Sequence, residues 1–161
     1  MDRRDFPARE DGLLRQYEVY VQTAENVSHR RERTNRFFIS LHSVLLAAVF
    51  SLARTLLNPT APGEGGVLMA LLLVTASVVG ILWNALWLYM IRAYRILNDA
   101  KFAVIQEMEN RLPCPCFQRE WHHLKHRRYP TLTRVERGVV WVVFLVYGVM
   151  LLLGLFLGFQ A

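Results

Sequence analysis

The chain has 161 residues, of which 53% are hydrophobic, and its formal net charge is +6. It is too short for several domains, and its apolar residues gather in blocks that are too long for an ordinary soluble domain. These features exclude a typical water-soluble globular protein and indicate a small integral membrane protein.

Three apolar blocks reach the length of about 20 residues that a helix needs to cross a hydrocarbon core of about 30 Å. They cover residues 37–57, 67–91 and 138–159. We therefore expect an all-α membrane protein with three transmembrane helices. Residues 1–36 contain no apolar segment typical of a secretory signal, so the first span is expected to remain as an anchor.

Helical periodicity extends beyond the first two blocks. No proline or glycine interrupts residues 13–57, so we expect one continuous helix there, preceded by a disordered segment over 1–12. The second block continues as an amphipathic helix over 67–112, which Pro113 ends. A turn over 58–66 would join the two helices as a long antiparallel hairpin that extends into the cytoplasm.

Residues 113–137 are expected to form an ordered cytoplasmic loop, because their first part contains three prolines and shows no sustained period. Thr133 and Glu136 have the spacing of a capping box at the start of the third span. Three aromatic side chains of the loop are expected to pack against the hairpin: Phe117, Trp121 and Tyr129.

The basic residues predict the orientation. Eight of the 19 Lys and Arg residues lie in residues 1–36 and ten in 92–137, whereas a single one, Arg54, lies within a span. By the positive-inside rule, both basic segments are cytoplasmic and the C-terminus is outside. Anionic lipid head groups are the expected partners of this charge. Nucleic acid is not expected, because no aromatic stacking platform accompanies it.

Polar and small residues form one stripe along the first span. They recur at steps of three or four, so they share one helical face: Arg36, Ser40, Ser43, Ala47, Ser51, Arg54 and Asn58. Polar groups at membrane depth usually face a bundle interior or a water-filled cavity, and no acidic residue lies within a span to pair with Arg54 or His42. This stripe is the candidate pore lining. The alternative is that the serines bond to their own helix and Arg54 extends to the interface.

Two further groups belong to the same interpretation. A basic cytoplasmic collar precedes the stripe and consists of Arg30, Arg31 and Arg33. Small and amide side chains in the other spans are expected to allow close helix packing: Ser77, Gly80 and Asn84 in the second span, and Gly154 and Gly158 in the third.

Two constellations resemble chemical sites but fit them poorly. The zinc-ligand types Cys114, Cys116, His122, His123 and His126 match no common structural zinc spacing, and Cys-Pro-Cys is too short for a routine structural disulfide. We expect no metal and no cofactor.

The pairs Arg36–His42 and Arg119–His126 have the Arg-x(4 to 6)-His spacing of one helical ribonuclease superfamily. The first pair lies at the predicted bilayer entrance, where RNA would hardly reach. No nucleophile elbow, phosphate loop or carboxylate cluster accompanies either pair, so we expect no enzyme.

Three segments of the chain carry a resemblance to a known family. They are LLRQYEVYVQTAENVSHRRERTNRFF, RAYRILNDAKFAVIQEMENRLPCPCFQREW and YPTLTRVE. In order and spacing they resemble the RipA-like small bacterial membrane proteins described as octameric. The resemblance implies a ring of subunits in the bacterial inner membrane, similar to the accessory pore protein of type VI CRISPR systems. It implies a role either in antiviral defence or in maintaining the cell envelope.

Three functions follow as hypotheses. The first is a homo-oligomeric, octameric pore lined by the stripe, which would permeabilise or depolarise the membrane. The second is a membrane-anchored scaffold whose segment 92–137 recruits a cytosolic protein. The third is a membrane-bound ribonuclease.

Overall fold

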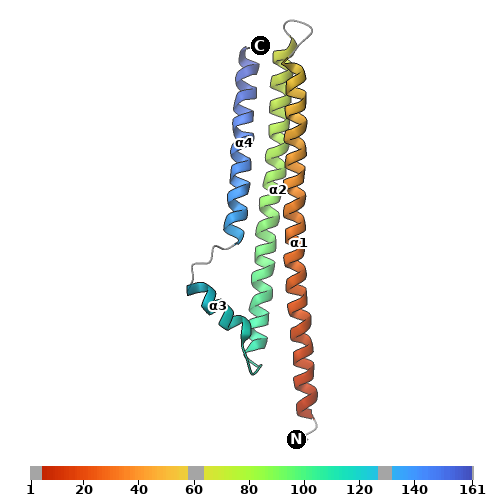
Figure 1. Cartoon of the computed structure of the whole chain (residues 1–161), viewed down its shortest axis with the longest axis vertical. Coiled ribbons are helices and arrows are strands. Elements are labelled where there is room, and N and C mark those ends of the chain that lie inside the picture. The colour runs from red at the N-terminus through yellow and green to blue at the C-terminus, as the bar shows by residue number, and fades with distance from the viewer. Residues whose placement is uncertain (1–4, 58–63, 127–131, 161) are drawn as a thin grey trace. The chain divides into compact units, whose positions relative to one another are not determined.

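The computed structural model describes residues 5–57, 64–126 and 132–160 (Figure 1), all of which are helical or lie in short turns, without strands. Four helices follow one another: α1 Asp5–Leu56, α2 Glu64–Glu109, α3 Cys116–His126 and α4 Leu132–Gln160. Of these, α1, α2 and α4 are long and apolar enough to cross a membrane. The prediction of an all-α protein with three transmembrane helices is confirmed.

Helix α1 begins at Asp5, whereas the composition of the N-terminal segment predicts disorder up to residue 12. Pro7 lies in the first turn, where a backbone amide has no helical partner, so its ring does not interrupt the helix. Gly12 lowers helix propensity without ending the helix. The expectation of disorder is therefore wrong for residues 5–12, and residues 1–4 lie outside the described chain.

Helix α2 also begins early, at Glu64, so residues 64–66 of the predicted turn are helical and 58–63 lie outside the described chain. The helix ends at Glu109 rather than Leu112. Arg111 N donates to Met108 O and Leu112 N to Glu109 O, both at 3.0 Å, so the chain turns before Pro113.

Residues 113–137 do not form a simple loop, because they contain all of α3 and the start of α4. Helix α3 is short and polar, and prolines lie near it on both sides in the sequence, so its helical period is hard to recognise. Phe117 packs against Tyr17 and Phe102, at ring centroid distances of 6.5 and 5.9 Å, as predicted. Tyr129 and the side chain of Trp121 lie outside the described part.

The chain divides into two compact units. Unit 1 contains Met1–Glu32 and Arg92–Leu132, and unit 2 contains Arg33–Ile91 and Thr133–Ala161. Within unit 1, α1 and α2 run antiparallel, because the earlier Tyr17 bonds to Glu109 and the later Thr23 bonds to Lys101.

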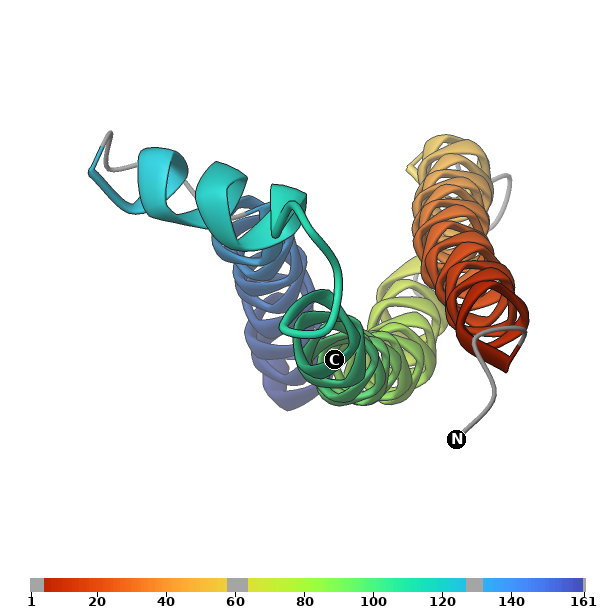
Figure 2. The ribbon, with the colours of Figure 1, turned by 90° about the horizontal axis from the view of Figure 1, so that it is seen from below.

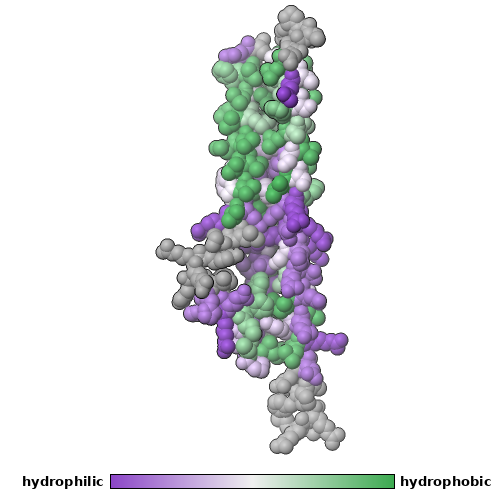
Figure 3. All heavy atoms as spheres, in the orientation of Figure 1, coloured by the Kyte–Doolittle hydropathy of each residue, from purple (hydrophilic) through white to green (hydrophobic). Residues whose placement is uncertain are grey.

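Unit 2 is a bundle of three helical segments, in which α2 lies between α1 and α4 (Figures 1 and 2). Its core is built from Phe38, Trp87, Ile91 and Val140, with the Phe38 and Trp87 rings stacked at 5.8 Å. Most of the outer surface is apolar: Leu82 and Leu145 are 63% and 69% exposed, and green apolar side chains cover most of the face of this unit in Figure 3. Such a surface suits contact with lipid or another subunit.

Candidate functional site

The polar stripe lies on the outer side of α1. Its described members are all exposed: Arg36, Ser40, Ser43, Ala47, Ser51 and Arg54. The buried residues of the same stretch, Phe38, His42 and Val49, recur at steps of four and seven and therefore form a separate face. Successive residues are about 100° apart on a helix, which puts the centres of the two faces on nearly opposite sides. The stripe thus points away from the other helices of unit 2. Asn58 lies outside the described residues.

Two stripe residues make contacts within α1. Ser43 Oγ donates to Ile39 O at 2.9 Å, and the Arg54 guanidinium lies 5.3 Å from the centroid of the Phe50 ring. The first contact gives the Ser43 hydroxyl a hydrogen-bond acceptor, and the second is a cation–π interaction. Both reduce the cost of exposing the stripe to an apolar medium, as the alternative interpretation of the sequence requires.

The predicted collar lies on α1 directly before the stripe in sequence. Arg30 and Arg33 are exposed, and Arg31 is half-buried; Arg36, the first residue of the stripe, is also exposed. Their charge is concentrated over a few residues at the end of the apolar span, where it can interact with anions or lipid head groups.

A glycine in α2 accommodates an aromatic side chain of α4. A Cβ added to Gly80 would overlap the Tyr147 ring, which is fully buried. The ring passes over Gly80 and places its hydroxyl 3.0 Å from His42 Nδ1 of α1, with which it shares a hydrogen bond. Gly80 therefore makes a contact between α1 and α4 possible. Tyr147 is thus the partner of His42, which no charge pattern in the sequence predicted.

The other small residues continue the contact between α2 and α4. A Cβ on Gly154 would lie 2.9 Å from the Val74 side chain, and one on Gly158 would lie 3.6 Å from Ala70 Cβ. Ser77 is buried, but its hydroxyl donates to Leu73 O of its own helix at 2.6 Å. Asn84 Nδ2 donates across the contact to Val140 O at 2.9 Å.

A second polar bridge joins all three helices of unit 2. Trp87 Nε1 donates to Asn35 Oδ1 at 2.9 Å, and Asn35 Nδ2 donates to Glu136 Oε1 at 2.7 Å. Helix α4 begins at Leu132, one residue before Thr133, and the Glu136 carboxylate accepts a hydrogen bond from α1. The side chain of Thr133 lies outside the described part, so the capping box stays a prediction.

A buried carboxylate organises unit 1. Glu109 is 1% exposed, and its oxygens accept hydrogen bonds from Phe117 N at 2.8 Å and Gln118 N at 3.1 Å. These amides belong to the first turn of α3, which a negative charge stabilises. The Tyr17 hydroxyl also donates to Glu109, at 3.1 Å. Burial, together with this hydrogen bond, raises the pKa of Tyr17 to about 12.

No sequence motif predicted the role of Glu109. The available signal was its spacing, since Phe102, Ile105 and Glu109 recur at steps of three and four, and Ile105 is fully buried. An acidic residue on a buried face just before a turn predicts a cap for the following segment.

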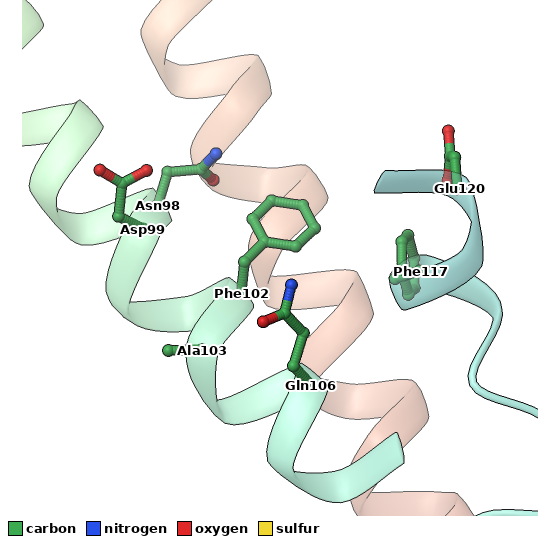
Figure 4. Close-up of a pocket in the computed structure, with 7 residues that line it drawn as sticks. All are labelled: Asn98, Asp99, Phe102, Ala103, Gln106, Phe117 and Glu120. Atoms are coloured by element: carbon green, nitrogen blue, oxygen red, sulfur yellow. The ribbon is translucent and has the colours of Figure 1, made fainter. Parts of the chain in front are cut away.

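Unit 1 also contains a groove of about 560 Å³ between α2 and α3 (Figure 4). Phe102 and Phe117 supply apolar walls, and Asp99 and Glu120 supply carboxylates. Asn98, Ala103 and Gln106 complete the lining. Asp99 also pairs with Arg95 at 3.7 Å on the exposed surface.

The candidate zinc ligands and ribonuclease pairs do not assemble into a site among the described side chains. No three His, Cys, Asp or Glu residues in that part of the chain gather as metal ligands. His42 is 4% exposed and packs between Trp87 and Tyr147, apart from the exposed Arg36. His122 and His123 are exposed on α3, and the side chain of His126 is outside the described part.

Comparison with known proteins assigns the family. No curated protein and no solved structure matches the chain. The model of the octameric membrane protein family (8xMP) matches residues 14–156, which include nearly all of the three apolar helices. The chain therefore belongs to the octameric membrane protein family, and it is a self-associating, multi-pass membrane protein.

Proposed function

We propose that the protein forms a homo-oligomeric pore, with eight copies in a ring and the polar stripe of α1 facing the lumen. One observation carries the proposal: the stripe is exposed on the side of α1 opposite the chain's own helix contacts, in a protein that self-associates. Exposed polar residues at membrane depth are costly in lipid, whereas a lumen formed by several copies hydrates them.

The charge of the stripe supports selectivity for anions. A ring of copies repeats Arg54 near one end of the lumen and Arg33 and Arg36 near the other. Repeated guanidinium groups in a narrow pore attract anions and repel cations. Because exposed charges are screened by salt, this selectivity weakens as ionic strength rises.

The proposed membrane is the bacterial inner membrane, with the N-terminus in the cytoplasm and the C-terminus outside, as the distribution of basic residues predicts. Anionic lipids would neutralise the cytoplasmic charge. Opening the pore would depolarise the cell, and the resemblance to the CRISPR-associated pore protein suggests a role in antiviral defence. The proposal includes no catalysis and no cofactor, and the burial of His42 supports a structural role for that histidine.

Conductance across planar bilayers tests the lining. We expect Ser43→Leu with Ser51→Leu to reduce single-channel conductance severalfold, because the lumen becomes narrower and less polar. Arg54→Gln should shift the reversal potential in a salt gradient towards lower anion selectivity.

The matched control is Thr55→Val. Thr55 is exposed in the same span, and its hydroxyl donates to Leu52 O at 2.7 Å, but it lies off the stripe. It tests whether loss of any self-bonded hydroxyl changes conductance. Equal conductance in the serine double variant and the wild type would remove the stripe from the lumen.

A scaffold that recruits a cytosolic protein is the second candidate, favoured by the groove in Figure 4. Two phenyl rings beside two carboxylates fit a segment that carries both apolar and basic side chains. On this hypothesis, Asp99→Lys with Glu120→Lys abolishes partner binding without changing the oligomer.

Glu107→Lys, an exposed change on α2 outside the groove lining, is the control. A photo-reactive side chain at Ala103 identifies the occupant of the groove in intact cells. A cross-link to another copy of the chain would assign the groove to the subunit interface and contradict the scaffold.

A further inference from the structure

The sequence Cys114–Pro115–Cys116 closes into a tight turn between α2 and α3. Cys116 N donates to Cys114 O at 3.1 Å, the hydrogen bond of a γ-turn with Pro115 at its centre. Proline fixes φ near the value that the central residue of an inverse γ-turn requires. The backbone thus holds the two cysteines close to each other.

The side chains follow the backbone. The two sulfur atoms lie 3.6 Å apart, with the Cys116 thiol directed at Cys114 Sγ, and both residues are exposed free thiols. Formation of a disulfide needs an S–S distance of about 2.05 Å, so a shift of roughly 1.5 Å would join them. Exposure leaves the sulfur atoms accessible to small oxidants.

We propose that Cys114 and Cys116 are a redox-active dithiol, which a hydroperoxide converts into an intrachain disulfide. This modification site is independent of whether the oligomer conducts ions. Exposed disulfides are readily reduced again, and those found in reducing compartments are usually regulatory or catalytic.

The reaction needs only the two thiols and the hydroperoxide. The thiolate of one cysteine attacks the peroxide; an S–O bond forms, the O–O bond breaks, and the leaving oxygen takes a proton to become water or an alcohol. The second thiolate then attacks the sulfenic sulfur; the S–S bond forms and the S–O bond breaks. The hydroxide that leaves the sulfenic sulfur takes up the proton that the second thiol released, and it departs as water. The hydrogen bond to Cys114 raises the pKa of Cys116, which favours Cys114 as the first nucleophile.

The dithiol is adjacent to the contacts that hold α3. Cys116 is the first residue of that helix, and the next two amides, those of Phe117 and Gln118, bond to Glu109. Movement of the Cys116 sulfur towards Cys114 rotates the start of α3. We therefore expect oxidation to weaken the cap and to loosen Phe117 from Tyr17 and Phe102.

Peroxide treatment of the full-length oligomer in detergent tests the proposal. After a quench and alkylation with a maleimide, intact mass should show the loss of two hydrogens and no added maleimide. Peptide mapping should place the link within one chain, between Cys114 and Cys116. Amide hydrogen exchange at Phe117 and Gln118 should be faster in the oxidised protein.

Three variants serve as controls. Cys114→Ser and Cys116→Ser should each lose the intrachain link. Pro115→Gly keeps both thiols but frees the turn, and it should slow disulfide formation roughly fivefold. The proposal is overturned if both thiols of the treated wild type still take up maleimide, if the links form only between chains, or if Pro115→Gly reacts as fast as the wild type.

Discussion

The helical segments of the two units are held together by different chemistry. In unit 2, the contacts that α4 makes with α1 and α2 include close-packed small residues and neutral hydrogen bonds, such as Asn84 to Val140 O and His42 to Tyr147. In unit 1, a carboxylate and a group of aromatic rings join the segments. Lipid provides no hydrophobic drive for helix association, whereas water does. The difference indicates that each unit is built for its own solvent.

The largest effect in unit 2 is expected when the space above Gly80 is filled. Gly80→Ala forces the buried Tyr147 ring to move and breaks its bond to His42, at a cost of about 3 kcal/mol. Gly148→Ala is the matched control, because no heavy atom lies within 4 Å of the added Cβ. Unfolding of both variants in mixed micelles measures the free energies. Equal stability of the two variants would mean that Tyr147 does not need the space.

The corresponding test of unit 1 is Glu109→Gln. An amide retains the shape but replaces one acceptor by a donor that faces backbone amides, so the cap should weaken by about 2 kcal/mol. Hydrogen exchange at Phe117 and Gln118 measures this change locally. Glu107→Gln, an exposed change two residues earlier, should leave both amides protected. Faster exchange throughout unit 2 as well would contradict the separation of the units.

Two buried polar side chains of α2 allow a comparison between a hydrogen bond to another helix and a hydrogen bond within the same helix. Asn84→Ala should lower the free energy of unfolding by about 1 kcal/mol, because Nδ2 bonds to α4. Ser77→Ala removes a hydroxyl that bonds only within α2, so its effect should be smaller. Mixed-micelle unfolding compares the two, and the reverse order would contradict this account of the contact.

The response of unit 1 to alkali tests the hydrogen bond from Tyr17 to Glu109. The pKa of Tyr17 rises from 10.0 to about 12 in the folded chain, so folding favours the protonated phenol. Its stabilisation is complete below about pH 10 and is lost as the pH rises through about 12. Thermal unfolding of the wild type and of Tyr17→Phe, followed from neutral to alkaline pH, should differ in this window. Parallel curves would exclude Tyr17 as the titrating group.

The sequence predicted the elements better than the contacts between them. Hydropathy located the three spans, and continuous helical periodicity predicted that α1 and α2 extend beyond them, because both signals are local. The ends of the helices were less accurate: Pro7 is tolerated in the first turn of α1, and α3 is a short helix that follows directly on Pro113 and Pro115.

The partners of polar residues could not be predicted in the same way. His42 and Tyr147 are separated by 105 positions, and Tyr17 and Glu109 by 92, so no local pattern joins them. The spacing of the stripe residues predicted that they share one face of α1. Whether that face points towards or away from the other helices depends on which residues of α1 pack against those helices. Phe38, His42 and Val49 supply that information only in the folded unit.

The contact at Gly80 also implies an order of assembly. Helix α4 follows α1 and α2 in the chain, and it supplies the Tyr147 hydroxyl for His42 and the Val140 carbonyl for Asn84. Before α4 inserts, the space above Gly80 is open, and the side chains of His42 and Asn84 lack these partners. Insertion of α4 fills the space above Gly80 and satisfies both groups in one step, so unit 2 is completed only when α4 enters the membrane.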